Sequence, residues 1–201
     1  LSADKKEGSN GYSDFSFRVI KDGEPGQEIT FDYFISGGSI NPAESSDFQD
    51  NSFPAGNSSI SSNETITIIN IPVSADTIIE PDQEFTITIF NASGNAMITT
   101  STATGIIRND DISLSISPLA AQGDEGNAND SSLTFTVERQ GYTDASSSVS
   151  YQVSGTGQNQ ADENDFHNNT FPTGLVNFSA NQLSKTITLY ISADPQVEPD
   201  E

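Results

Sequence analysis

Apolar and polar residues alternate along several short stretches of the chain. In residues 13–20, Phe15, Phe17 and Val19 share one face of an extended chain, and residues 28–36 continue the pattern. Alternation with a period of two predicts half-buried β-strands, whereas an amphipathic helix has a period of about 3.6 residues, which no stretch shows. The pattern therefore predicts an all-β fold.

Further strands are expected at residues 58–62, 64–74, 85–92, 102–108 and 112–117, with a short edge segment before Glu7. The apolar phase slips at Ile68 and Ile69, which predicts a β-bulge. Residues 37–57 are rich in Gly, Asn, Ser and Pro and are expected to form a long loop, with room for a short strand at Asp47-Phe48. Short strands joined by polar turns are typical of an antiparallel β-sandwich.

The chain matches itself at a constant offset of 118 residues, without a gap. A register held over most of a repeat indicates two copies of one domain. We assign the copies to residues 1–111 and 112–201, with residues 109–111 as a very short junction. The first copy begins within its first strand, and the second copy stops before its last two strands, so we expect an excerpt of a longer array. The matched pairs include Glu7-Gly8 with Glu125-Gly126, Tyr33 with Tyr151, Asp47-Phe48 with Asp165-Phe166, and Glu80-Pro81-Asp82 with Glu198-Pro199-Asp200.

Charge narrows the range of partners. The 201 residues include 29 Asp and Glu against 7 Lys and Arg, a formal net charge of −22. Nucleic acids and anionic membranes require basic patches, so the sequence argues against both. The chain has no Cys, which excludes disulfides and thiolate metal sites. It also has no apolar run of about 18 residues, so we expect no membrane insertion in this segment.

The densest acidic segment, residues 76–85, lies between two alternating stretches and is expected to be a loop. In an antiparallel sandwich, successive connections alternate between the two ends. Counting the strands places four acidic segments after odd-numbered strands, and therefore at one end of the first domain. These segments contain Glu7, Asp47, the group Asp76, Glu80 and Asp82, and the pair Asp110 and Asp111.

Carboxylates that converge without Lys or Arg partners repel one another and favour a bound cation. Calcium accepts about six to eight oxygen ligands in flexible geometry, whereas zinc and copper prefer His or Cys. The competing interpretation is a solvated acidic surface. The recurrence of acids at matched positions favours calcium, although Asp82 and Asp200 are the members that the pattern supports least. The recurring acids are Glu125, Asp165, Asp194, Glu198 and Asp200.

In order, the chain presents Glu-Gly, an Asp-aromatic pair, Asp-x-x-x-Glu-Pro-Asp before a Phe-led strand, and Asn-Asp-Asp. This order of motifs resembles the Calx-beta repeat of sodium–calcium exchangers, integrin beta-4 and large bacterial surface proteins, over nearly the whole chain. The resemblance implies immunoglobulin-like antiparallel β-sandwiches in tandem, with calcium ions at one end of the domain. By position, it implies the ligands Glu7, Asp47, Asp76, Glu80, Asp110 and Asp111 in the first copy, and Glu125, Asp165, Asp194, Glu198 and Glu201 in the second.

The chain also departs from the family pattern. Gln83 stands where the calcium-binding members have an acid, whereas Glu201 keeps the acid in the second copy. Thr77, Pro195 and Asn109 replace further acids. The resemblance therefore implies fewer ions per site, bound more weakly than in the exchanger, and some members of the family bind no calcium.

The first functional hypothesis is a calcium-binding structural or adhesive repeat of a long extracellular or cell-surface protein, secreted and bacterial. Calcium would stiffen the junction at Asp110 and Asp111. Its partners would be calcium ions, neighbouring repeats, and a cell-surface or matrix protein or glycan. The alternatives are a calcium-sensing regulatory module of a membrane transporter or receptor, which would be cytoplasmic, and a metal-free scaffold for protein binding. We expect no enzyme, because the one His, His167, lies in a polar loop and the acidic cluster recurs in tandem.

Overall fold

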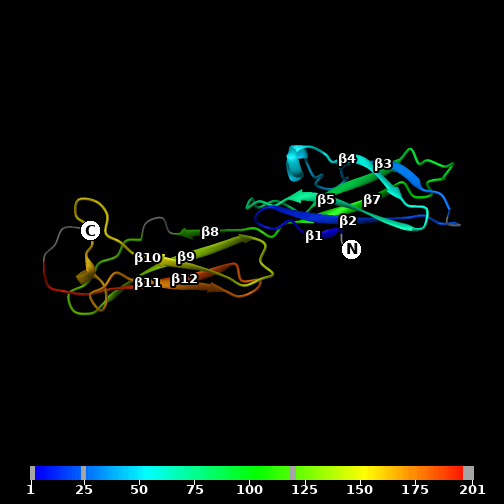
Figure 1. Ribbon diagram of the computed structural model, residues 1–201. Coiled ribbons are helices and arrows are strands. Elements are labelled where there is room, and N and C mark those ends of the chain that lie inside the picture. The colour runs from blue at the N-terminus through cyan, green and yellow to red at the C-terminus, as the bar shows by residue number, and fades with distance from the viewer. Residues whose placement is uncertain (1–2, 24–25, 118–120, 197–201) are drawn as a thin grey trace. The chain divides into compact units, whose positions relative to one another are not determined.

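The structure, a computed structural model, describes residues 3–23, 26–117 and 121–196. The chain divides into two compact units, residues 1–111 and 112–201, which we call unit 1 and unit 2. Both consist of strands joined by loops, and the described residues form no α-helix (Figure 1). The predicted all-β class is confirmed.

Unit 1 is built from two sheets. One has the strand order β1-β7-β6-β3-β4, and the other pairs β2 with β5. The neighbouring strands are antiparallel, except that β1 runs parallel to β7. The bounds are β1 (Asp4–Lys6), β2 (Tyr12–Ile20), β3 (Ile29–Gly37), β4 (Ala55–Ile60), β5 (Ile66–Ser74), β6 (Gln83–Phe90) and β7 (Thr102–Arg108).

Aromatic rings join the two sheets of unit 1. Phe85 of β6 meets Phe15 and Phe17 of β2 and Phe48 of the β3–β4 loop, with ring centroids 5.4–5.7 Å apart in edge-to-face geometry. Gly105 of β7 pairs with Phe85 across the sheet, and a Cβ at this glycine would overlap the phenyl ring. Edge-to-face contacts add to the burial of aromatic area. In the sheets that this core joins, Glu7, Asp76 and Asp110 come after the ends of β1, β5 and β7.

The predicted bulge in β5 is wrong. The β2–β5 ladder runs from its first pair to its last without skipping a residue. Ile69 and Ile71 face the core, whereas Ile66 and Ile68 lie on the outer face and are 42% and 49% exposed. Ile66 pairs there with the exposed Ile20. The apparent change of phase arises because β-branched residues are favoured on both faces of a strand.

The loop between β3 and β4 contains two short 3-10 turns, Ser45–Asp47 (η1) and Gln49–Asn51 (η2), in place of a strand. Phe48 lies between the two turns, is fully buried and forms a single bridge to Val73 of β5. The bridge holds Asp47 beside the end of β5. The strand expected at residues 58–62 begins earlier, as β4.

Unit 2 also has two sheets, with the orders β12-β9-β8 and β10-β11. Its core consists of Val137, Val176, Phe178, Ile187 and Leu189. The described part of the chain contains no helix long and apolar enough to cross a membrane. The bounds are β8 (Ile112–Ser117), β9 (Ser131–Gly141), β10 (Ser147–Gln152), a 3-10 turn η3 (Glu163–Asp165), β11 (Thr173–Phe178) and β12 (Ser184–Ile191).

Candidate metal centre

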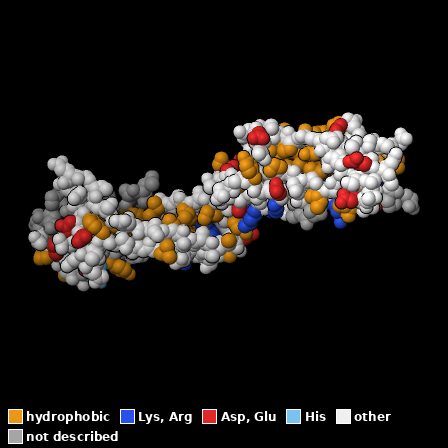
Figure 2. Space-filling model, in the orientation of Figure 1, with side chains coloured by type: hydrophobic (Ala, Val, Ile, Leu, Met, Phe, Trp, Pro, Cys, Tyr) orange, Lys and Arg blue, Asp and Glu red, His pale blue; other side chains and the backbone are white. Residues whose placement is uncertain are grey.

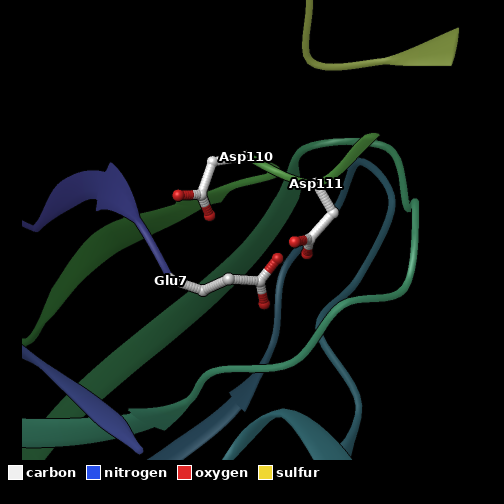
Figure 3. A group of neighbouring side chains, drawn as sticks. All are labelled: Glu7, Asp110 and Asp111. Atoms are coloured by element: carbon white, nitrogen blue, oxygen red, sulfur yellow. The ribbon is translucent and has the colours of Figure 1, made fainter. Parts of the chain in front are cut away.

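The parallel pairing of β1 with β7 brings Glu7 beside Asp110 and Asp111. The ladder ends at the pair Lys6–Arg108, and the Glu7 N–H donates to the Arg108 carbonyl at 3.3 Å. Both strands therefore leave the sheet at the same end. One carboxylate oxygen from each of Glu7, Asp110 and Asp111 lies within 4.8 Å of the others. Figure 3 shows the Glu7 side chain extending toward the carboxyl group of Asp111.

A glycine turn fixes the position of Glu7. Gly8 has φ +91°, a left-handed conformation that residues with a Cβ rarely adopt. Its N–H donates to Asp110 Oδ1 at 3.0 Å. The backbone therefore reverses directly after Glu7 and is tied to the segment that follows β7.

Glu7 is buried among other acids, with 4% of its surface exposed. Burial is the largest cause that raises the pKa of Glu7, and together with the charges of the neighbouring acids it brings the pKa from 4.5 to about 8. These acids are Asp76, Glu80, Asp111 and Asp110. A carboxyl group with this pKa holds its proton at neutral pH when no cation is present.

The β5–β6 loop and the turn η1 supply the remaining acids predicted for the first copy. Burial raises the pKa of Glu80, and the charges of Asp47, Asp76 and Glu44 contribute in the same direction. Burial is also the main cause that raises the pKa of Asp47, to which the Asp76 charge adds. Charge interactions decline with distance. Asp47, Asp76 and Glu80 therefore lie near enough to influence one another, but they are not part of the group whose carboxylate oxygens lie within 4.8 Å of one another.

Asp111 carries the clearest sign of a missing partner. It is 5% exposed, and its Oδ2 atom has no hydrogen-bond partner among the described residues. Burial raises the pKa of Asp111, the charges of Asp110 and Asp76 contribute, and a hydrogen bond from the Ser9 side chain to this carboxyl group lowers it. A buried carboxylate oxygen without a donor is costly. A cation in contact with that oxygen would remove the cost.

Asp82 does not join this group. Its Oδ2 accepts from Arg108 Nη1 at 2.6 Å, and its Oδ1 accepts from the Asn109 N–H at 3.2 Å. The Asn109 side chain in turn donates to the Asp111 carbonyl at 3.2 Å and accepts from the Glu80 N–H at 3.3 Å. The sequence analysis missed the roles of Arg108 and Asn109. The signal was the rarity of cationic residues, because Arg108 is one of only 7 Lys and Arg.

Unit 2 repeats parts of this geometry. Asp194 Oδ1 accepts from the Gln196 N–H at 2.7 Å, as Asp76 Oδ1 accepts from the Ile78 N–H at 2.7 Å. Asp165 accepts from the Asp162 N–H in the turn η3. However, the described residues of unit 2 contain no three carboxylates as close together as those of unit 1. Glu198, Asp200 and Glu201 lie outside the described residues.

The donor set of unit 1 consists of carboxylate oxygens. Oxygen ligands from several segments suit a hard divalent cation such as calcium, and a wide multi-carboxylate site suits calcium better than magnesium. The one His of the chain belongs to unit 2, where it is 59% exposed and lies 3.0 Å from Asp130. Acidic side chains are spread over the visible surface of both units, while Lys and Arg occupy few places on it (Figure 2).

Comparisons with known proteins place the fold. No family model matches the chain, and no curated protein matches it. The solved structure of CBD12 from CALX1.2 is similar over 94% of this chain and 72% of that chain, with 20% identity and a TM-score of 0.50. The calcium binding domain CBD12 of CALX1.1 matches over 88% and 68%, with 20% identity and a TM-score of 0.47. The apo-form Calx CBD1 domain matches over 49% and 83%, with 25% identity and a TM-score of 0.43. The likeness to CBD12 from CALX1.2 is one of fold, and at that level it confirms the resemblance to Calx-beta domains.

Proposed function

We propose that this chain is a calcium-binding β-sandwich repeat, and that unit 1 holds calcium through the acids at the end of β1, β5 and β7 and in the β3–β4 loop. One observation carries the proposal: Glu7, Asp110 and Asp111 bring carboxylate oxygens within 4.8 Å of one another, and a buried oxygen of Asp111 has no hydrogen-bond partner among the described residues. The ligand set proposed is Glu7, Asp47, Asp76, Glu80, Asp110 and Asp111.

The mechanism is electrostatic. Without a cation, the buried acids disfavour one another's charged forms, as the raised pKa of Glu7 reflects. A bound calcium ion supplies the positive charge that this end of unit 1 lacks. The ligands come from four segments that meet only in the folded state, so binding stabilises the fold.

We extend the proposal to the connection between the units. Strand β7 ends at Arg108 and β8 begins at Ile112, so residues 109–111 form the whole connection. Two of the proposed ligands, Asp110 and Asp111, lie in it. Calcium would therefore fix the conformation of the connection and stiffen the chain at this point. This role fits a long extracellular or cell-surface protein that contacts neighbouring repeats and a surface or matrix protein or glycan. It also fits a chain without Cys and with a net charge of −22.

A second, weaker site in unit 2 belongs to the same proposal. Its ligands would be Glu125, Asp165, Asp194, Glu198 and Glu201. Support comes from the repeat, because Asp194 and Asp165 reproduce the local hydrogen bonds of Asp76 and Asp47. In both units, the proposed activity is binding rather than catalysis.

A regulatory module is the second candidate function. Its support is the likeness in fold to CBD12 from CALX1.2, because CBD12 of CALX1.1 is described as a calcium binding domain. Calcium titration by calorimetry separates the two candidates. A dissociation constant of about 10⁻⁴–10⁻³ M is typical of extracellular modules, and about 10⁻⁷–10⁻⁵ M of sensors.

Thermal unfolding of the 201-residue chain tests calcium binding directly. Calcium at a hundredfold excess over its dissociation constant is expected to stabilise unit 1 by about 2.7 kcal/mol relative to excess EDTA. Magnesium at the same concentration is expected to do much less. Asp111→Asn is expected to abolish most of the calcium effect.

Asp22→Asn is the matched control, because Asp22 is exposed and follows β2 at the other end of the sandwich. It changes the net charge equally and is expected to leave the calcium effect intact. A melting temperature that does not respond to calcium in the unsubstituted protein would refute the proposal. The metal-free scaffold would then be the better description.

A further inference from the structure

Arg108, the last residue of β7, is a cationic side chain that binds two segments of the acidic end. Its Nε and Nη2 donate to the two carboxylate oxygens of Asp4 in β1, at 2.6 and 2.8 Å. Its Nη1 donates to Asp82 of the β5–β6 loop at 2.6 Å. One guanidinium therefore ties together three segments that supply the proposed ligands.

We propose that Arg108 is a positioning residue, which holds β1 in register so that Glu7 remains at the cation site, and which keeps Asp82 out of that site. This inference rests on the proposed function of unit 1. It concerns the support of the ligands, not the ligands themselves.

Strand β1 is held weakly in its sheet. The strand has three residues and pairs with β7 alone. Glu7 directly follows it, so the position of this proposed ligand depends on the end of a short edge strand. The fork from Arg108 to Asp4 fixes that strand through two parallel charge-assisted hydrogen bonds.

The Arg108 guanidinium and its two carboxylate partners are about half exposed. Half-exposed ion pairs usually contribute little to global stability, but bidentate pairs joined in a network are the exception. The Arg108 side chain is 45% exposed, and those of Asp4 and Asp82 are 50% and 47% exposed. We therefore expect Arg108 to act on the local position of β1 more than on the melting temperature.

Arg108 also holds Asp82 away from the cation site. Both of its oxygens are occupied, one by Arg108 and one by the Asn109 N–H. Its position two residues after Glu80 would otherwise make it a natural additional ligand. By binding Asp82, Arg108 leaves the site with the six proposed ligands.

The test compares Arg108→Gln with Arg18→Gln in the full chain. Arg18 is exposed on β2, so its substitution changes the net charge equally at a different place. Loss of a residue that orients a metal ligand typically weakens metal affinity by about 10–100-fold, and we expect about tenfold weaker calcium binding for Arg108→Gln by calorimetry. Arg18→Gln is expected to change the affinity less than about twofold. Arg108→Lys keeps the charge but cannot form the fork, and we expect it to restore little of the affinity.

A double-mutant cycle with Glu7 separates positioning from a general structural role. If Arg108 acts through Glu7, the double variant Glu7→Gln with Arg108→Gln binds calcium no more weakly than Glu7→Gln alone. Additive losses would overturn the inference. A loss equal in size to that of Arg18→Gln would also overturn it.

Hydrogen exchange in excess EDTA supplies a readout that needs no calcium. Arg108→Gln is expected to accelerate exchange of the Glu7 and Gly8 amides, which bond to the Arg108 carbonyl and to Asp110, without a comparable change in β2 and β5. Unchanged exchange would overturn the inference. If the unsubstituted protein binds no calcium, the proposed function fails, and the exchange result alone decides the role of Arg108.

Discussion

The Glu-Gly turn has nearly the same geometry in the two units. Gly8 and Gly126 have φ values of +91° and +88°. A Cβ at Gly8 would lie 3.7 Å from the Cβ of Ala75, which follows β5, and a Cβ at Gly126 would lie 3.8 Å from the Cβ of Ala193, which follows β12. Yet Glu7 is buried, with 4% of its surface exposed, whereas Glu125 is only partly buried. The same local motif therefore leads to two different environments.

Strand β7 accounts for the difference. It pairs with β1 in unit 1 and delivers Asp110 and Asp111 to Glu7. Among the described residues of unit 2, Glu125 belongs to no such group of three carboxylates. A repeat motif therefore does not make a site by itself, because the carboxylates of several segments have to meet.

The two units also differ at the end that lies opposite the acidic segments. In unit 2, Arg139 is 2% exposed, and its guanidinium donates to three backbone carbonyls and a serine hydroxyl. In unit 1, Lys21 stands at the matched position and donates to two carbonyls at 3.1 Å. Those two carbonyls belong to Gln27 and Ser61, the matched positions of Ala145 and Ser179 in unit 2.

The largest effect is expected from a substitution that disrupts the core of unit 1 and leaves the core of unit 2 intact. Phe85→Ala removes the ring that contacts three other rings of unit 1, and we expect a loss of about 3–5 kcal/mol. Calorimetry should show the transition of unit 1 move to lower temperature while that of unit 2 stays. Movement of both transitions by the same amount would show that the units unfold together.

The second largest effect is expected in the pH dependence of stability of the metal-free protein, which should differ between the two units. The pKa of Glu7 is raised from 4.5 to about 8, so the folded state holds the proton more tightly than the unfolded state. In EDTA, unit 1 should therefore lose stability as the pH rises from about 4.5 to about 8, by at most about 1.4 kcal/mol per pH unit for one group.

Glu7→Gln provides the control for this dependence. It removes the titrating group, and we expect a flatter profile of melting temperature against pH in EDTA. Saturating calcium should flatten the profile of the unsubstituted protein as well, because the cation binds the charged form. A steep profile that survives Glu7→Gln would assign the effect to other acids.

Arg139 lies in unit 2 at the end opposite the acidic segments, and it should contribute more to stability than its counterpart Lys21 does in unit 1. A hydrogen bond to a charged group contributes about 1.5–3 kcal/mol net, and the cost of burying the charge offsets part of the sum. Arg139 makes more such bonds than Lys21. We expect Arg139→Met to destabilise unit 2 by about 2–3 kcal/mol and Lys21→Met to destabilise unit 1 by about 1 kcal/mol. Urea denaturation measures both, and equal losses would contradict the comparison.

The smallest expected effect sharpens the comparison of the acidic ends. Glu7→Gln and Glu125→Gln are the same change at matched positions. We expect Glu7→Gln to weaken calcium binding about tenfold, or about 1.4 kcal/mol, and Glu125→Gln to have a smaller effect. Calorimetric titration checks this, and equal effects would argue for equivalent sites.

The strands were predictable because one face of each is buried. Alternation at Phe15, Phe17 and Val19 located β2, and the same reasoning located β3, β6 and β7 to within a few residues. It failed at Ile66 and Ile68, because isoleucine occurs on the outer face as well as in the core. The sequence pattern records which residues are apolar, not which of them have a sheet above them.

The acidic end was predictable as a meeting place, since the order of strands decides at which end each connection lies. Which of the acids belong to the candidate site was harder to predict. Asp82 and Asp110 look alike in the sequence, and the difference between them comes from Arg108 and Asn109, which bond to Asp82 across the sheet. Such bonds depend on register, which alternation alone does not fix.

The parallel pairing of β1 with β7 also has a mechanical consequence. Tension on the chain at both ends of unit 1 would pull β1 toward its beginning and β7 toward its end, in opposite directions along neighbouring strands. The hydrogen bonds from Ile106 N–H to the Ala3 carbonyl and from Glu7 N–H to the Arg108 carbonyl would then be loaded in shear and would have to break together. An ion shared by Glu7 and Asp110 would lie across the same pair of strands, so the calcium concentration would set the force at which unit 1 gives way.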